Sequence, residues 1–223
     1  MTRNVILRAT PEESLEIWLQ VRSCPNPTYS IIGTTKEKQE VKKIKVVEPI
    51  KSKKDIKRLE SYLQKKNERN FLLFVMGINI GLRISDILSI NVGDVKNRSY
   101  IKIIEKKTHK YKKIPINSKL KYLLKNFVKN RNDDEPLFFT QRKNRLDRIQ
   151  AYKILKDACT NIGLNYNIGT HSLRKTFGYH HYKQFKDIVI LQKIFNHSTT
   201  SITLRYIGID QDIIDESYKN FVL

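Results

Sequence analysis

The feature that most constrains the fold is an unbroken apolar stretch in the first half of the chain. FLLFVMGI, residues 71–78, has no polar face, and a helix that is apolar all round is buried on most sides. In the preceding segment Ile56, Leu59 and Leu63 recur at helical spacing and form a single apolar stripe. Gly81 then breaks the pattern. Other elements must therefore pack around the helix that contains 71–78.

The rest of the pattern alternates further helices with one pair of short strands. Residues 100–105 and 112–116 are rich in β-branched side chains and are joined by a basic turn, which predicts an antiparallel hairpin. Helices are expected within residues 84–90, 120–131, 147–163, 169–181, 186–196 and 209–223. The predicted fold class is α+β, mainly helical, with a small antiparallel hairpin.

Residues 1–48 differ from the rest. They hold one short amphipathic stretch and a charge-rich tail, too little for a core of their own. We expect an N-terminal arm or linker at 1–48 and one domain at 49–223. Cys24 and Cys159 match no zinc or redox motif. The first residues do not resemble a signal peptide, which favours a cytoplasmic protein.

The charge balance points to a polyanionic partner. Lys and Arg number 43 against 22 Asp and Glu, a formal net charge of +21. No apolar run approaches the roughly 18 residues of a membrane-spanning helix, so nucleic acid is favoured over a membrane. The expected phosphate contacts are Lys106, Lys110, Lys112, Lys113 and Lys175, with further basic residues in 36–69 and 142–148. The alternative is that these side chains are solvated helix faces with no partner.

The segment GTHSLRKTF places an imidazole and a guanidinium at the start of a helix. His171 and Arg174 are three residues apart and therefore share a face. Gly169 is a turn residue, and Thr170 is expected to cap the helix. Because the first turn has unpaired N–H groups and the positive end of the helix dipole, it is a place to hold a phosphate.

Combined with Arg83, His197 and Tyr206, this pair supplies what a metal-free transesterification of a phosphodiester needs. Two guanidinium groups can neutralise the non-bridging oxygens and the charge of the transition state. A tyrosine hydroxyl becomes a nucleophile once its proton is removed, and histidine titrates in the right range to assist. A lysine on the hairpin can protonate the leaving 5′ oxygen. No metal and no cofactor is required.

The motifs GLRISD, KKTHKYKKIPI, THSLRKTF, FNHSTT and TLRYIGI, in this order, resemble the tyrosine recombinases, the phage integrase family. The resemblance spans residues 50–215 and implies an integrase-type catalytic domain. It also implies a covalent 3′-phosphotyrosyl intermediate in site-specific recombination or integration of mobile DNA. The implied catalytic residues are Arg83, Lys107, His171, Arg174, His197 and Tyr206.

Within the basic turn, Lys107 is chosen over its lysine neighbours because the family's lysine tends to lie just before the turn. Asp86 stands where many members have Glu, and we expect it to help orient Arg83. Asn196 stands where many have Gly. Integrases usually carry a helical core-binding domain before the catalytic domain, of about one hundred residues, an ordinary domain size. Here 48 residues precede the expected catalytic domain. Three interpretations of the chain stay open: a catalytic fragment, a short family member, or a component that works beside another recombinase.

The sequence leaves three other functions open. They are topoisomerase-like relaxation without site specificity, a non-enzymatic DNA-binding regulator, and a metal-dependent nuclease using His180, His181 and His197. The last is disfavoured because no carboxylates cluster around these histidines. On DNA a homo-oligomer, a tetramer, is expected. The C-terminal helix would dock Ile213 and Phe221 on a neighbouring protomer.

Overall fold

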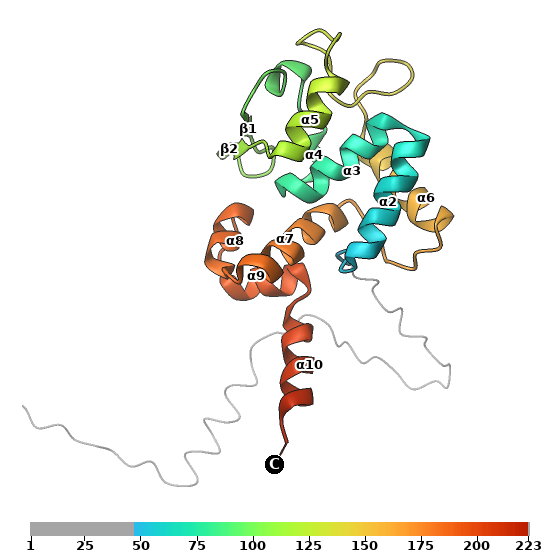
Figure 1. The fold of residues 1–223 in the computed structure, drawn as a ribbon. Helices are drawn as coiled ribbons and strands as arrows, with labels where there is room; N and C mark the ends of the chain where they lie inside the picture. Colours follow the sequence, from blue (N-terminus) through green and yellow to red (C-terminus); the bar gives the residue numbers. More distant parts are fainter. Residues whose placement is uncertain (1–46, 223) are drawn as a thin grey trace, which may run out of the picture. The chain divides into compact units, whose positions relative to one another are not determined.

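The computed structural model describes residues 47–222, so the expected arm at 1–48 lies outside the described residues except for its last two positions. Figure 1 follows the elements along the chain. The elements are α2 (Lys53–Lys66), α3 (Glu68–Ile80), α4 (Ile84–Ile87), η2 (Val92–Asp94), β1 (Tyr100–Ile104), β2 (Tyr111–Pro115), α5 (Ser118–Phe127), α6 (Arg148–Asn161), α7 (Ser172–Phe185), α8 (Ile188–Phe195), α9 (Thr200–Ile207) and α10 (Asp210–Asn220). The mainly helical α+β class is confirmed.

Helix α3 is the centre of the main core. Its side chains are buried along nearly its whole length, and it packs against α2, α5 and α7. Asn67 separates it from α2, because its backbone N–H donates to Leu63 O while its side chain accepts the Asn70 N–H. Gly81 ends α3 in the left-handed conformation, with φ of 64°. The burial of the apolar stretch and its end at Gly81 are therefore confirmed.

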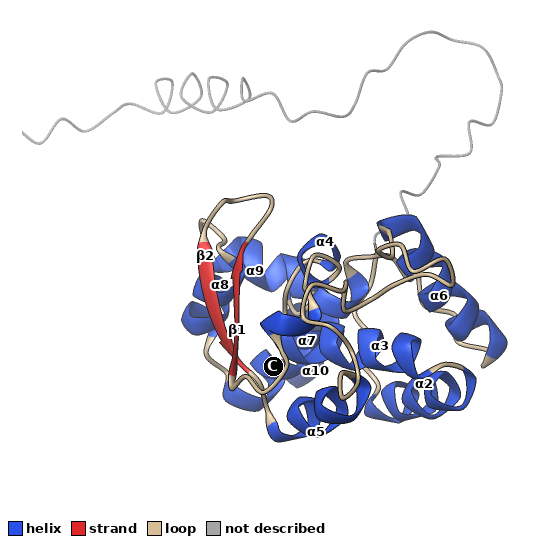
Figure 2. Ribbon diagram, turned by 90° about the horizontal axis from the view of Figure 1, so that it is seen from above, coloured by secondary structure: helices blue, strands red, loops and turns tan. Residues whose placement is uncertain are grey.

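Strands β1 and β2 form the expected antiparallel hairpin. Their register runs from Tyr100 opposite Pro115 to Ile104 opposite Tyr111, and the turn between them is residues 105–110. The view from above in Figure 2 places this hairpin at one end of the domain and α2 and α6 at the other, with α3 and α7 between them. At the start of the turn, Lys106 N–H donates to Asp86 Oδ1 and Glu105 Oε2 accepts from Asn196 Nδ2, so these residues join it to the body of the domain.

The turn before α7 corrects one expectation. His171, rather than Thr170, is the residue that precedes the helix, and its side chain gives no capping bond. The Ser172 hydroxyl accepts the Gly169 N–H at 3.0 Å, and the Ser172 N–H donates to Gly169 O at 3.0 Å. The expected Thr170 cap is wrong because this pair of bonds closes the turn without it. The consequence is that His171 lies at the opening of the helix.

Helices α7, α8 and α9 enclose a smaller second core. Its buried members are Leu191, Phe195, Ile207 and Ile209. The helix expected at 209–223 begins one residue later, because Ile209 is buried just before it. Helix α10 has no buried residue and projects from the domain in Figure 1, and its Ile213 is 45% exposed. The chain after residue 209 is thus outside both cores.

No helix within residues 47–222 is long and apolar enough to cross a membrane. Of the two cysteines, Cys24 lies outside the described residues and Cys159 is buried in α6. Burial raises the pKa of the Cys159 thiol to about 11, with a smaller contribution from the charge of Asp55. The thiol is therefore protonated and unreactive at neutral pH.

Candidate active site

The expected catalytic side chains come from separate elements that meet on one side of α7. Arg83 precedes α4, His171 and Arg174 open α7, His197 lies between α8 and α9, and Tyr206 is in the last turn of α9. The structure brings these five side chains together in one cluster, called the pocket below. Lys107 lies outside it, in the hairpin turn.

Arg174 is bound by the main chain. Its side chain is almost fully buried, at 2% exposed. Nη1 donates to Gly81 O at 2.8 Å and Nη2 donates to Phe195 O at 2.9 Å, while the guanidinium lies 4.4 Å from the centre of the Phe195 ring. These bonds replace the water that a buried charge loses. They also hold the ends of α3 and α8 against α7.

Arg83 is held by carboxylates instead. Its Nη1 is 3.1 Å from Glu105 Oε1 and 4.0 Å from Asp86 Oδ2. Both acids are fully buried. The other oxygen of Asp86, Oδ1, accepts the N–H of Lys106 at 3.0 Å. The contact with Asp86 agrees with the expectation that this acid helps to orient Arg83.

Tyr206 lies between the two histidines. His171 Nδ1 is 3.3 Å from Tyr206 Oη, and the His197 ring meets the Tyr206 ring edge-on at 5.1 Å between centres. Burial raises the pKa of Tyr206, and the positive charges of Arg174 and Arg83 oppose this rise. The pKa of His171 is lowered by burial and then by the charges of Arg174 and Lys175. A neutral His171 can therefore accept the phenol proton.

His197 is fixed by a chain of hydrogen bonds. The Thr203 hydroxyl donates to Thr199 O at 3.1 Å, so it accepts from His197 Nδ1, also at 3.1 Å. This arrangement assigns the imidazole proton to Nδ1. Burial lowers the pKa of His197, and the charge of Arg174 adds to the effect.

The lysines of the hairpin differ in their exposure and contacts. Lys106, Lys107 and Lys110 are exposed. On β2, Lys113 covers the Tyr100 ring, with Nζ 4.2 Å from its centre. These positions are open to a ligand that approaches the hairpin.

Lys112 differs from the other lysines of the hairpin because it points into the pocket. Its side chain is 15% exposed, its Nζ is 3.0 Å from Glu105 Oε1, and it also donates to Ile194 O. Burial lowers the pKa of Lys112 although its bond to Glu105 opposes this. The sequence grouped Lys112 with surface phosphate contacts and did not indicate this inward position.

Lys175 lies beside the nucleophile candidate. Its Nζ donates to Val47 O at 2.7 Å and is 5.3 Å from the centre of the Tyr206 ring. Burial lowers the pKa of Lys175. The lysine therefore ties the entering chain to the edge of the pocket.

Glu105 is the pocket residue that the sequence analysis missed. It follows β1 directly, and on that strand Ile101 and Ile103 face inward while their neighbours face outward. The period of two places Glu105 on the inward side as well. An acid on the buried face of a strand is unusual unless it is paired. An acidic residue at an inward position of the strand period was therefore the signal by which the sequence could have identified Glu105.

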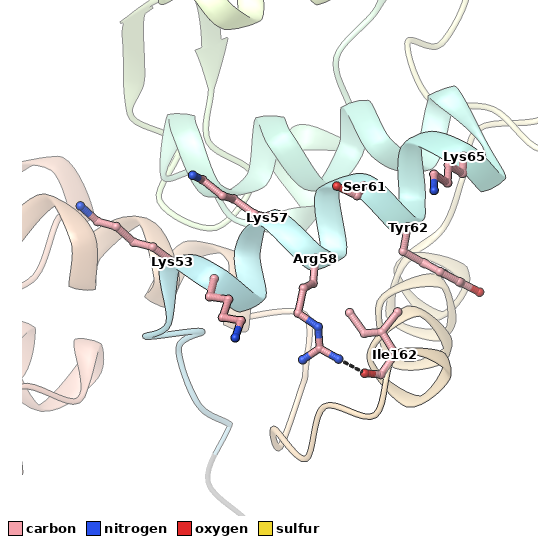
Figure 3. A pocket seen from close by; sticks show the side chains of 8 residues that line it. Lys53, Lys57, Arg58, Ser61, Tyr62, Lys65 and Ile162 are labelled. Atoms are coloured by element: carbon pink, nitrogen blue, oxygen red, sulfur yellow. Dashed lines mark hydrogen bonds between the residues drawn. The ribbon is translucent and has the colours of Figure 1, made fainter.

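A second positive surface lies along α2. A groove there is lined by Lys53, Lys54, Lys57, Arg58, Ser61, Tyr62, Lys65 and Ile162. Figure 3 shows the Arg58 side chain bonded to Ile162 O, while Lys53 and Lys57 extend away from it. Basic residues of α2, which are part of the segment 36–69, thus line one groove.

The histidines considered for a metal have other surroundings. His180 Nε2 is 3.0 Å from Ile50 O, and His181 packs against the rings of Phe177 and Phe185. Within residues 47–222, no group of three or more His, Cys, Asp or Glu side chains is placed to hold a metal ion.

Comparison with known proteins gives a consistent assignment. Residues 50–212 match the model of the phage integrase family. The probable integrase/recombinase YoeC of Bacillus subtilis is 48% identical over 177 residues, covering 79% of this chain and 97% of YoeC. The tyrosine recombinase XerA of Pyrococcus horikoshii is 29% identical over 157 residues, 68% of this chain and 54% of XerA.

Solved structures agree on the fold. A crystal structure of XerA recombinase superposes with a TM-score of 0.64 at 19% identity, over 83% of this chain and 66% of that one. A lambda integrase dimer bound to a COC′ core site gives 0.61 at 16% identity, over 74% and 49%. The chain thus spans nearly all of YoeC but about half of the XerA sequence. It belongs to the phage integrase family, the tyrosine recombinases.

Proposed function

We propose that this tyrosine recombinase cleaves DNA with the phenol of Tyr206. DNA strand breaking and rejoining is the reaction of its family, and the chain is an enzyme of that type. Two observations support this assignment of the nucleophile: the 3.3 Å approach of His171 Nδ1 to Tyr206 Oη, and the guanidinium groups beside them. A half-buried phenol next to a neutral base and fixed cations is arranged for attack on a phosphate.

Tyr206 Oη bonds to phosphorus while the bond from phosphorus to the 5′ oxygen breaks, which leaves a 3′-phosphotyrosyl ester. His171 takes the phenol proton, and Lys107 gives a proton to the departing 5′ oxygen. Arg83 and Arg174 stabilise the charge on the non-bridging oxygens, and His197, held by Thr203, packs edge-on against the Tyr206 ring and helps to hold the phenol in place. The reverse attack by a 5′ hydroxyl rejoins a strand without metal or nucleotide.

The wider assignments are proposals of the same kind. Residues 49–223 act as the catalytic domain and 1–48 as an arm. The substrate is double-stranded DNA, held by Lys106, Lys110, Lys112, Lys113 and Lys175 and by the α2 groove. The assembly on DNA is a tetramer, and the protein works in the cytoplasm. Topoisomerase-like relaxation and a non-enzymatic regulatory role are not favoured by the family assignment.

The proposal is tested by trapping the covalent intermediate. Wild-type protein and Tyr206→Phe are incubated with supercoiled plasmid in EDTA and quenched with detergent, and protein joined to DNA is measured. Wild-type protein is expected to form the adduct. The variant should form none while binding DNA with nearly unchanged affinity, because it loses a single hydroxyl. An equal adduct yield from both proteins would overturn the assignment of Tyr206.

A further inference from the structure

Glu105 is a buried carboxylate whose two oxygens have different surroundings. It has no exposed surface, and it is the first residue after strand β1, at the start of the turn that carries Lys107. Burial raises the pKa of Glu105, but hydrogen bonds from Thr108 and Lys112 and the nearby positive charges outweigh it and hold the pKa at about 2. The side chain is therefore an anion at neutral pH.

One oxygen of this carboxylate faces the cations of the pocket. Glu105 Oε1 is 3.0 Å from Lys112 Nζ, 3.1 Å from Arg83 Nη1 and 3.9 Å from Arg174 Nη1. Together with Asp86 it leaves one excess positive charge in the cluster. That excess suits a phosphodiester, which carries a single negative charge.

The other oxygen, Oε2, contacts the two chain segments that carry Lys107 and His197. Glu105 Oε2 accepts from the Thr108 hydroxyl at 2.6 Å and from Asn196 Nδ2 at 3.0 Å. Thr108 follows Lys107 in the sequence, and Asn196 precedes His197. Asn196 has φ of 55°, a left-handed conformation in which Asn is tolerated and Gly is favoured. The Asn196 side chain thus makes a hydrogen bond to Glu105 that Gly at this position could not make.

We propose that Glu105 is a positioning residue that fixes the turn of Lys107 relative to Arg83. This inference rests on the proposed function, in which Arg83 binds the scissile phosphate and Lys107 protonates the leaving oxygen. The hydrogen bond from Thr108 fixes the conformation of the turn, and the ion pair with Arg83 fixes the position of its guanidinium. Glu105 touches neither the phosphate nor the leaving group.

Two variants separate these contacts. Thr108→Val keeps the shape of the side chain and removes only the hydrogen bond to Oε2. Glu105→Gln keeps the size but turns an amide or a neutral oxygen toward Arg83 and Lys112, so it disturbs both contacts. Thr160→Val makes the same chemical change at an exposed position of α6 and serves as the control. If Glu105→Gln fails to fold, Thr108→Val still tests the proposal.

Two substrates separate a defect in protonating the leaving group from a defect in the other steps. Adduct formation on supercoiled plasmid in EDTA needs a proton on the 5′ oxygen. A DNA duplex ending in a 3′-p-nitrophenyl phosphate releases p-nitrophenolate, which leaves without one, and yields the same phosphotyrosyl ester. A misplaced acid therefore slows the first reaction and spares the second.

We expect Thr108→Val to slow adduct formation on plasmid by roughly 10- to 100-fold, because small misplacements of a catalytic group cost rates of this order. Its release of p-nitrophenolate should match that of the wild type. Glu105→Gln should be slow on both substrates, since Arg83 acts on both.

The opposite results overturn the inference. A Thr108→Val protein that equals the wild type on plasmid, or that is slowed equally on both substrates, excludes positioning of the Lys107 turn. Wild-type rates for Glu105→Gln exclude positioning of Arg83. A failure of the proposed function looks different, because the wild type itself then forms no adduct and releases no p-nitrophenolate.

Discussion

At the scale of single residues, each buried cation of the pocket is matched to a main-chain carbonyl or a carboxylate. Arg174 uses the carbonyls of Gly81 and Phe195, and Arg83 uses acids. Such pairing offsets the large cost of removing a charge from water. Since Arg174 spans two carbonyls with a planar fork, lysine cannot replace it without losing one of them.

The depressed pKa of His171 sets an expected pH profile for strand cleavage. The neutral form accepts the phenol proton, so the rate of adduct formation should stay level as pH falls to about 6.5, the ordinary histidine value. It should decline only below the lowered pKa. Lys175→Gln removes a neighbouring positive charge, raises the pKa of His171 and should shift the decline to higher pH. Initial rates measured across buffers provide the check.

The control for this profile is Lys183→Gln, a charge removed at the far end of α7 where the side chain is exposed. It should leave the profile in place. A decline that begins above the ordinary histidine value, or one that Lys175→Gln does not move, would be incompatible with His171 as the proton acceptor.

The identities of the proposed catalytic residues could be predicted from sequence because their motifs are local. His171 and Arg174 share one helical turn, and Tyr206 lies nine residues beyond His197. The inward roles of Glu105 and Lys112 could not be predicted in this way. They depend on contacts with Asn196 and Ile194, which are 91 and 82 residues away along the chain, and no local pattern encodes such a pairing.

At the scale of elements, the pocket depends on the close packing of α3 against α7. A Cβ added at Gly77 would lie 2.3 Å from Leu173 Cδ1 and 2.9 Å from Leu173 Cβ. Leu173 immediately precedes Arg174. The absence of a side chain at Gly77 therefore lets α7 approach closely enough for Arg174 to reach Gly81 O.

Gly77→Ala should lower the free energy of unfolding by about 1–3 kcal/mol, the usual cost of overpacking a core. Leu173→Ala alone should cost about 2–5 kcal/mol through the cavity it leaves. Because the added methyl group would occupy part of that cavity, the double variant should lose less than the sum. Urea unfolding monitored by circular dichroism measures all three, and strict additivity would contradict the close contact.

Sequence patterns predicted the elements better than their ends. The hairpin strands and the helix end at Gly81 are confirmed, because turn residues and periodicity mark them directly. The Thr170 cap was wrong since Ser172 closes the turn instead. Ile209 was placed on the last helix, whereas packing against α8 and α9 draws it into the second core. Both errors arise where tertiary contacts override a local preference.

At the scale of the whole molecule, α10 contributes little to the cores of the domain. It has no buried residue, and its Asp212 pairs with the partly exposed Lys51 and bonds to Tyr179. A helix of this length is not stable alone in water. Its half-exposed Ile213 and Ile214 and its exposed Phe221 offer an apolar surface for a second copy.

Deletion of residues 210–223 should leave the unfolding temperature nearly unchanged and weaken DNA-dependent oligomers. Ile213→Asp should weaken them too, because it places a charge in the apolar face. Gln211→Glu adds the same charge on the other side of the helix and should not. Analytical ultracentrifugation with and without DNA makes the comparison, and unchanged oligomers after the deletion would exclude α10 as the contact.

The bonds of Arg174 also have a consequence for the moment at which the protein becomes active. Its guanidinium joins a carbonyl 93 residues earlier to one 21 residues later, and Tyr206 follows both. Domains are completed from the N-terminus during synthesis. A chain whose last residues are still within the ribosome therefore lacks a folded Tyr206, the proposed nucleophile. The order of residues along the chain delays the capacity to cut DNA until the domain has folded around Arg174.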